Sequence, residues 1–182
     1  MIDRLRWILP DWLRTDLDEL HSTLRTVSST NDSHLGEIIL RADRIFVTGQ
    51  GRTGLVMRMF AMRLMQLVKT AFVLGDVTTP AVGPGDLLIA GSGSGETEGV
   101  VSVARRAREM GVRVAAITSK PDSSLAKLAD HTTVISGATS QLPMVSVVEQ
   151  ALLIFTDCIA AWLASQSGQT NETMRARHAN LE

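Results

Sequence analysis

The pattern of apolar and polar positions changes from a helical period to short apolar runs near residue 44. Before that point, Trp and Leu residues recur every three or four positions, which predicts an amphipathic helix over residues 2–27. A second, short helix is expected after Ser33, with the polar stretch 28–33 as the turn between the two helices. Residues 1–42 therefore form a predicted N-terminal helical arm.

From residue 43 onward, short runs rich in Val, Ile and Leu alternate with segments of helical period. Apolar strands alternating with helices are typical of a parallel sheet that is covered on both faces. The predicted class is therefore α/β, a three-layer αβα sandwich whose five-stranded parallel sheet has the flavodoxin-like order 2-1-3-4-5. We expect one domain over residues 1–182, with the sheet core at 43–137 and C-terminal helices at 138–182. The expected strands are 44–49, 71–75, 86–92, 112–119 and 132–137, and the expected helices after the arm are 52–67, 96–111, 122–130 and 145–164.

Two glycine-rich loops follow the first and third predicted strands: "GQGRTG" at 49–54 and "GSGSGET" at 91–97. In the predicted order these two strands are neighbours, and their helices leave toward opposite faces of the sheet. A crevice opens at the carboxyl ends of such strands, and ligands bind there. Both loops are therefore expected to border one ligand site.

The second loop has the composition of a phosphate site. Its glycines allow backbone N–H groups to point into one concavity, and Ser92, Ser94 and Thr97 add hydroxyl donors near a helix start. It has no lysine and lacks the ending of a nucleotide P-loop, so it suits a phosphomonoester better than a nucleoside triphosphate. The alternative is a plain strand-to-helix turn capped by hydroxyls.

The first loop formally matches the dinucleotide fingerprint G-x-G-x-x-G, and Asp76 could act as the acid that binds a ribose. A lone match of this kind is a weak signal, so a dinucleotide-binding protein stays an alternative. Arg52 and Thr53 offer a guanidinium and a hydroxyl at the start of a helix. We interpret them as contacts to sugar hydroxyls or phosphate.

Net charge and hydropathy limit the classes of binding partner that we expect. The net charge of −1 gives no basic field, so nucleic acid and a membrane surface are not expected partners. The longest apolar stretch, 150–164, is short for a membrane span and contains Asp157, which indicates a core helix. Cys158 within it is expected to be a buried thiol in a reducing cytoplasm. Trp7 and Trp12 in the arm need a cover, which favours an oligomer.

The segments "GQGRTG", "FAMRLMQL", "TTP", "GSGSGET", "DSSLAKLAD", "VEQALLIFTD" and "ARHANLE" together resemble the 6-phospho-3-hexuloisomerase family of small sugar-isomerase (SIS-domain) enzymes, from about residue 45 to 182. The resemblance implies interconversion of D-arabino-hex-3-ulose 6-phosphate and fructose 6-phosphate through a cis-enediolate. This reaction is the second step of ribulose monophosphate formaldehyde fixation. The resemblance also implies a cytoplasmic homotetramer without a cofactor, with its sites at subunit interfaces.

Carried over residue by residue, the resemblance assigns a phosphate site, a proton acceptor and a histidine near a neighbouring subunit's site. Glu96 borders the same loop, where a capping charge is a simpler role for it than a base. The other histidines are not at metal-ligand spacing, so no metal is expected. The substrate-binding set is Arg52, Thr53, Ser92, Gly93, Ser94, Gly95, Glu96 and Thr97, and the catalytic set is Glu149 and His178.

Three features depart from the family pattern. Gln66 stands where the family usually has histidine, Val148 replaces a more usual phenylalanine, and the segment 138–148 is short. These departures keep two alternatives open. One is a SIS module that senses a sugar phosphate without turning it over, and the other is an isomerase of a different sugar phosphate.

Overall fold

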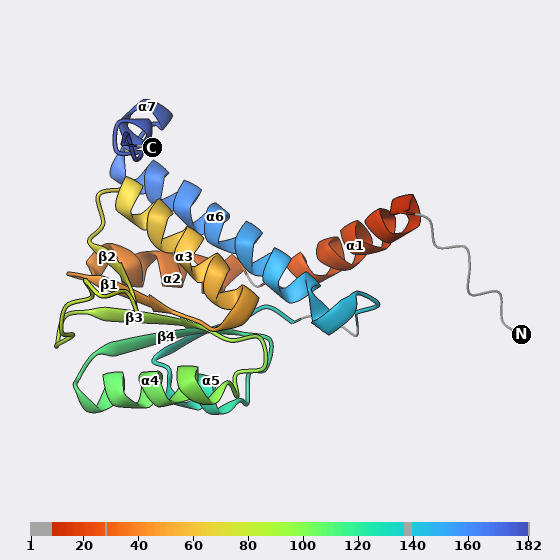
Figure 1. Cartoon of the computed structure of the whole chain (residues 1–182), viewed down its shortest axis with the longest axis horizontal. Helices are drawn as coiled ribbons and strands as arrows, with labels where there is room; N and C mark the ends of the chain where they lie inside the picture. Colours follow the sequence, from red (N-terminus) through yellow and green to blue (C-terminus); the bar gives the residue numbers. More distant parts are fainter. Residues whose placement is uncertain (1–8, 28, 137–139, 182) are drawn as a thin grey trace, which may run out of the picture.

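A computed structural model of the chain describes residues 9–27, 29–136 and 140–181. Its five strands form one parallel sheet in the order β2-β1-β3-β4-β5, which confirms the predicted class and strand order (Figure 1). The strands are β1 (Ile45–Thr48), β2 (Ala71–Val73), β3 (Leu87–Gly91), β4 (Arg113–Thr118) and β5 (His131–Val134).

Helices cover both faces of this sheet (Figure 1). Figure 1 shows α2, α3 and α6 on one face and α4 and α5 on the other, while α1 projects from the body and α7 lies at the far end of α6. The helices are α1 (Leu9–Leu24), α2 (Ser29–Arg41), α3 (Gly51–Gln66), α4 (Glu98–Glu109), α5 (Ser124–Leu128), α6 (Val147–Ser167) and α7 (Asn171–Arg175), with a 3-10 turn, η1 (Pro143–Val145), before α6.

The central strands β1, β3 and β4 are buried on both faces, and their side chains alternate between two cores, as the pleat of a strand requires. In β1, Ile45 and Val47 join the core beneath α2, α3 and α6, where Phe60 and Phe155 are buried. Phe46, between them, joins the core beneath α4 and α5. This two-sided burial explains why the strands appear in the sequence as continuous apolar runs.

An ion pair ties β1 to β3 at the end of the sheet opposite the glycine loops. Arg44 Nε and Nη2 donate to the two carboxylate oxygens of Asp86 at 2.8 and 2.6 Å. Asp86 is buried, and the hydrogen bond from Arg44 lowers the pKa of its carboxyl group. The register Ile45 against Leu87 follows directly after this pair, so the pair helps to fix the two strands that carry the site.

Two local expectations were wrong. Helix α2 begins at Ser29, within the stretch predicted to be a turn, because Ser, Thr, Asn and Asp also favour the start of a helix. Cys158 is exposed in this chain rather than buried. Helix α6 is apolar almost all round, so its composition does not indicate which side faces solvent. Trp7 lies outside the described residues.

Helix α6 is the one helix of the described chain that is long and apolar enough to cross a membrane by length and composition alone. Core helices of globular proteins pass the same test. In this fold α6 packs against α1, α2 and α3, and Leu152, Phe155, Ile159 and Leu163 are buried in the larger core. These contacts agree with the prediction of a core helix.

Candidate active site

Hydrogen bonds of Ser92, a buried residue, organise the loop after β3. Its hydroxyl lies 2.9 Å from Thr97 Oγ1 and accepts the Gly95 N–H at 3.1 Å. Its backbone N–H donates to the carbonyl of Ile117 on β4 at 3.0 Å. Ser92 therefore fixes the shape of the loop as well as offering a hydroxyl beside it.

Gly95 adopts a left-handed conformation with φ of 67°, and the start of α5 presses against it. A Cβ built on Gly95 would lie 2.1 Å from Ser123 Oγ and 2.9 Å from Thr118 Oγ1. The Gly95 carbonyl also accepts the Leu125 N–H at 3.0 Å. Only glycine meets both the conformational and the packing requirement at this position.

Glu96 is turned toward α5. Its carboxylate accepts the Ser124 N–H at 2.8 Å, and this hydrogen bond lowers the pKa of the carboxyl group. The contact agrees with a capping charge at the start of α5. The Gly95 N–H is already bonded to Ser92 and the Glu96 N–H to Ser94 Oγ at 3.2 Å, so the loop offers an anion its hydroxyls and its other N–H groups.

The start of α4 adds further donors to the same loop. Thr97 is the N-cap residue, and its hydroxyl faces Ser92 and makes no capping bond to α4 within the described chain. The first N–H groups of an α-helix have no partner inside the helix, and the helix dipole favours a negative charge there. The serine-rich loop and the α4 terminus therefore place hydroxyl and N–H donors side by side, an arrangement suited to an anion.

The first glycine loop packs directly on the second. Thr53 Cγ2 lies 3.1 Å from the position that a Cβ on Gly91 would take, and Gln50 Nε2 lies 2.2 Å from the corresponding position on Gly99. Gln50 thus covers the first turn of α4. Gln50 is not among the residues predicted from the sequence, although it is a large polar residue between the first two glycines of "GQGRTG".

Glu149 lies in the first turn of α6, whose start is next to the loop after β3. Its neighbour Val148 places Cγ1 3.6 Å from the position of a Cβ on Gly93. Arg52 Nε donates to Glu149 Oε2. The structure thus brings Arg52 to the expected proton acceptor, a contact across 97 residues of chain that no local pattern announces.

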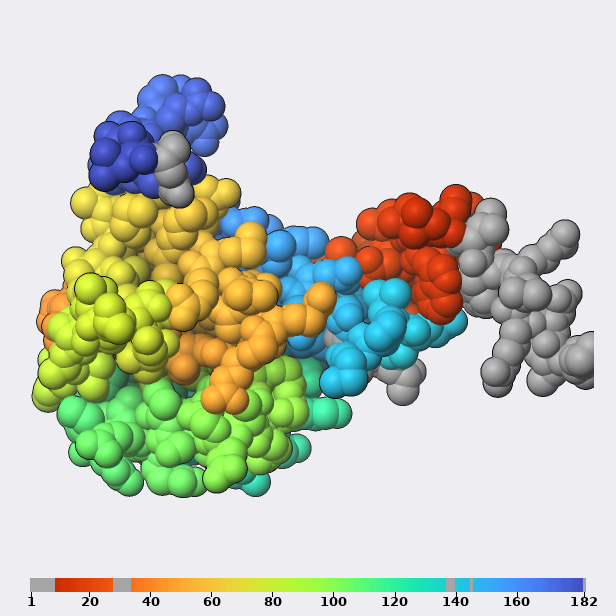
Figure 2. Space-filling model, in the orientation of Figure 1, coloured from red at the N-terminus to blue at the C-terminus, as the bar shows by residue number. Residues whose placement is uncertain are grey.

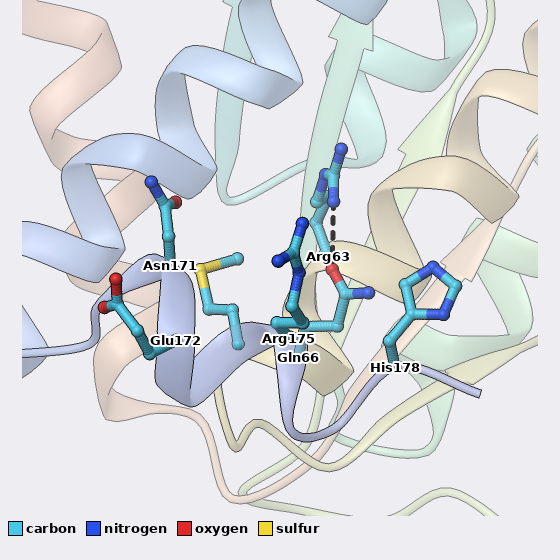
Figure 3. A pocket seen from close by; sticks show the side chains of 7 residues that line it. Arg63, Gln66, Asn171, Glu172, Arg175 and His178 are labelled. Carbon is cyan, nitrogen blue, oxygen red and sulfur yellow. Dashed lines mark hydrogen bonds between the residues drawn. The ribbon is translucent and has the colours of Figure 1, made fainter. Parts of the chain in front are cut away.

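His178 does not lie beside Glu149 and the glycine loops in this chain. It lines a cavity of about 380 Å³ beside α7 together with Arg63, Gln66 and Arg175 (Figure 3). Gln66 is buried there, and its side-chain oxygen accepts from Arg63 Nη1 at 3.0 Å. Helix α6 is about 30 Å long at 1.5 Å per residue, and it separates His178 from Glu149. The two expected catalytic residues do not meet within one chain.

Two further observations concern a metal ion and the candidate ribose acid. No group of three or more His, Cys, Asp or Glu side chains is arranged to hold a metal ion in the part of the chain that the structure describes. Asp76, the candidate ribose acid, accepts a hydrogen bond from Arg58 at 2.8 Å.

The comparisons with known proteins agree with this geometry. The model of the SIS domain matches residues 38–159. A 3-hexulose-6-phosphate isomerase of Bacillus subtilis is 39% identical over 175 residues, which cover 91% of this chain and 95% of that protein. The corresponding protein of Mycobacterium gastri is 42% identical over 91% of this chain and 87% of its own length. This chain belongs to the 3-hexulose-6-phosphate isomerase family of SIS-domain proteins.

A solved structure from Methanococcus jannaschii extends the family relation to the whole fold. It superposes with a TM-score of 0.87 at 31% identity, over 94% of this chain and 99% of that one. A function of 3-hexulose-6-phosphate isomerase was inferred for that protein. The resemblance seen in the sequence motifs is therefore confirmed at the level of the family and the fold.

Proposed function

We propose that this protein is a 3-hexulose-6-phosphate isomerase that interconverts D-arabino-hex-3-ulose 6-phosphate and fructose 6-phosphate. One observation supports the proposal: the lysine-free loop after β3 lies beside the first turn of α6, which carries Glu149, and Val148 Cγ1 is 3.6 Å from the position of a Cβ on Gly93. The chain is also about 40% identical to two proteins named for this reaction.

In this proposal the phosphate lies in the concavity after β3. Ser94 and the backbone N–H groups of Gly93 and Gly95 border it, together with the hydroxyls of Ser92 and Thr97. The first turn of α4 adds its free N–H groups. Thr53 closes the site from the other loop. Binding the phosphate here would direct the sugar carbons toward the start of α6.

Glu149 then acts as the proton carrier. It removes the proton from C2 of the 3-ulose, which gives a cis-enediolate across C2 and C3, and it returns the proton to C3. Meanwhile the C3 oxygen gains a proton and the C2 hydroxyl loses one, so that the carbonyl moves from C3 to C2 with no net change in atoms. His178 is proposed to relay the protons between these oxygens. The reaction needs no cofactor.

We further propose a single-domain, cytoplasmic enzyme that assembles as a homotetramer with sites at subunit interfaces. Several large apolar side chains support assembly because they are exposed in one chain: Leu55, Met59 and Met62 on α3, Ile154 on α6, and Leu13 and Leu17 on α1. Helix α1 projects from one end of the body, where only part of it packs against α6 (Figure 2). A second copy is the proposed cover for these faces.

If His178 serves a neighbouring site, inactive variants should complement one another. Glu149→Gln and His178→Ala chains are each expected to show little activity, whereas tetramers refolded from an equal mixture should regain up to about a quarter of the sites by random pairing. The assay is turnover before and after mixing. A mixture no more active than its components would show that His178 does not act in a neighbouring site.

A coupled assay on purified protein with a panel of hexulose, pentose and heptose phosphates tests the proposed reaction. Turnover of hex-3-ulose 6-phosphate, with fructose 6-phosphate as product, is the expected result. Gln66 favours the second candidate, a non-catalytic sensor, because an amide cannot exchange protons as the family histidine can. Phosphosugar binding without turnover of any member of the panel would support the sensor instead.

A further inference from the structure

The ion pair between Arg52 and Glu149 joins the two halves of the proposed site. Arg52 is the second residue of α3, and Glu149 lies in the first turn of α6. The first turn of α3 has no acidic residue, and the dipole of a helix disfavours a positive charge at this end. A guanidinium at this position is therefore stabilised by an anion that another element supplies, and Glu149 is that anion in this structure.

The ion pair between Arg52 and Glu149 is partly exposed to solvent, and it uses only part of the Arg52 guanidinium. The Arg52 side chain is 62% exposed and that of Glu149 is 20% exposed, and ion pairs that reach solvent are weak and screened by salt. Arg52 uses only its Nε–H for Glu149. The other four guanidinium N–H groups have no partner among the described residues, so they are free to bind an incoming anion.

The incoming anion has its own site beside this pair. Thr53, next to Arg52, packs on Gly91, and Val148, next to Glu149, packs on Gly93. Both members of the pair thus flank the loop proposed to bind the phosphate. A phosphate ester carries up to about two negative charges at neutral pH, so it attracts the guanidinium more strongly than a single carboxylate does.

We propose that Arg52 is a positioning residue that holds Glu149 through this ion pair and transfers to the anionic substrate when the substrate binds. The transfer releases the carboxylate toward the sugar carbons only when a phosphosugar is present. This inference rests on the proposed function. The competing interpretation is that Arg52 permanently fastens α3 to α6.

Ligand affinity distinguishes these two roles. Glucitol 6-phosphate is a suitable probe because it has no carbonyl and cannot be isomerised, and its dissociation constant can be measured by isothermal titration calorimetry. If binding must first break the pair, Glu149→Gln should tighten binding by about two- to fivefold more in the presence of Arg52 than in an Arg52→Gln background. The gain in the Arg52→Gln background reports only the relief of direct repulsion by Glu149.

Control variants test whether the change in affinity is specific to Arg52 and Glu149. Arg58 lies on the same helix, is half-exposed and pairs with Asp76 at 2.8 Å, so Arg58→Gln with and without Asp76→Asn should leave the affinity unchanged. Arg52→Lys keeps the cation and should retain part of the effect, and thermal melting checks that each variant folds. The inference would be overturned if Glu149→Gln increased the affinity for glucitol 6-phosphate equally or less in the presence of Arg52 than in the Arg52→Gln background. It would also be overturned if glucitol 6-phosphate bound to none of the variants. Absence of turnover by the unmodified chain would instead refute the proposed function, because the calorimetric cycle does not depend on catalysis.

Discussion

Replacing Glu149 with Gln is expected to lower kcat for isomerisation by about 10²- to 10⁴-fold, the usual contribution of a positioned acid–base group. The amide keeps the shape of the side chain and cannot accept a proton from carbon. Because the proposed phosphate donors come from the loop after β3 and from the start of α4, the variant should still bind glucitol 6-phosphate. Steady-state turnover and calorimetry on the same preparation measure the two effects.

Glu37→Gln provides the matched control for this substitution. Glu37 is a half-exposed carboxylate on α2 that pairs with Arg41, so the change removes one charge from the chain without touching the proposed site. Its kcat should equal that of the unmodified protein. A Glu149→Gln enzyme with nearly full kcat would show that another group carries the proton.

Gly95→Ala is expected to disrupt the phosphate loop and to raise KM more than tenfold. The left-handed conformation alone costs about 1–2 kcal/mol for a residue with a Cβ. The new Cβ would also lie 2.1 Å from Ser123 Oγ, so either the loop or the start of α5 must shift. We expect the free energy of unfolding to fall by about 2–4 kcal/mol in total, as measured by urea denaturation.

Gly168→Ala separates the cost of the left-handed conformation from the cost of the steric clash. Gly168 ends α6 with φ of 64°, close to the value at Gly95, and no described atom lies within 4 Å of a Cβ built on it. This variant should lose only the conformational part, about 1–2 kcal/mol, and should keep its KM. If both glycine variants show the same KM, the contact of Gly95 with α5 does not shape the phosphate site.

The strands and the two glycine loops could be predicted from the sequence because they have local signals, and the alternation of strands and helices then indicated the sheet order. Buried parallel strands are apolar throughout, and loops that must approach a ligand are rich in glycine, so "GQGRTG" and "GSGSGET" mark the ends of β1 and β3 directly. The family motifs then pointed to Glu149 and His178, which no spacing rule connects.

The contacts within the site could not be predicted in the same way. The pairing of Arg52 with Glu149, and the packing of Gln50 over Gly99, join residues on different elements whose separation depends on how α3, α4 and α6 sit on the sheet. The exposure of Cys158 depends on which side of an apolar helix meets the core. Such facts follow from tertiary packing and leave no periodic signal in the chain.

The central claim is that a carboxylate on α6 moves a carbon-bound proton of a phosphosugar anchored after β3. Proton NMR of fructose 6-phosphate in ²H₂O tests it most directly, since each visit to the enediolate allows the C3 hydrogen to be replaced by deuterium. We predict that the C3–H signal fades with the unmodified protein and persists with Glu149→Gln. Loss of that signal at the same rate with both proteins would contradict the account.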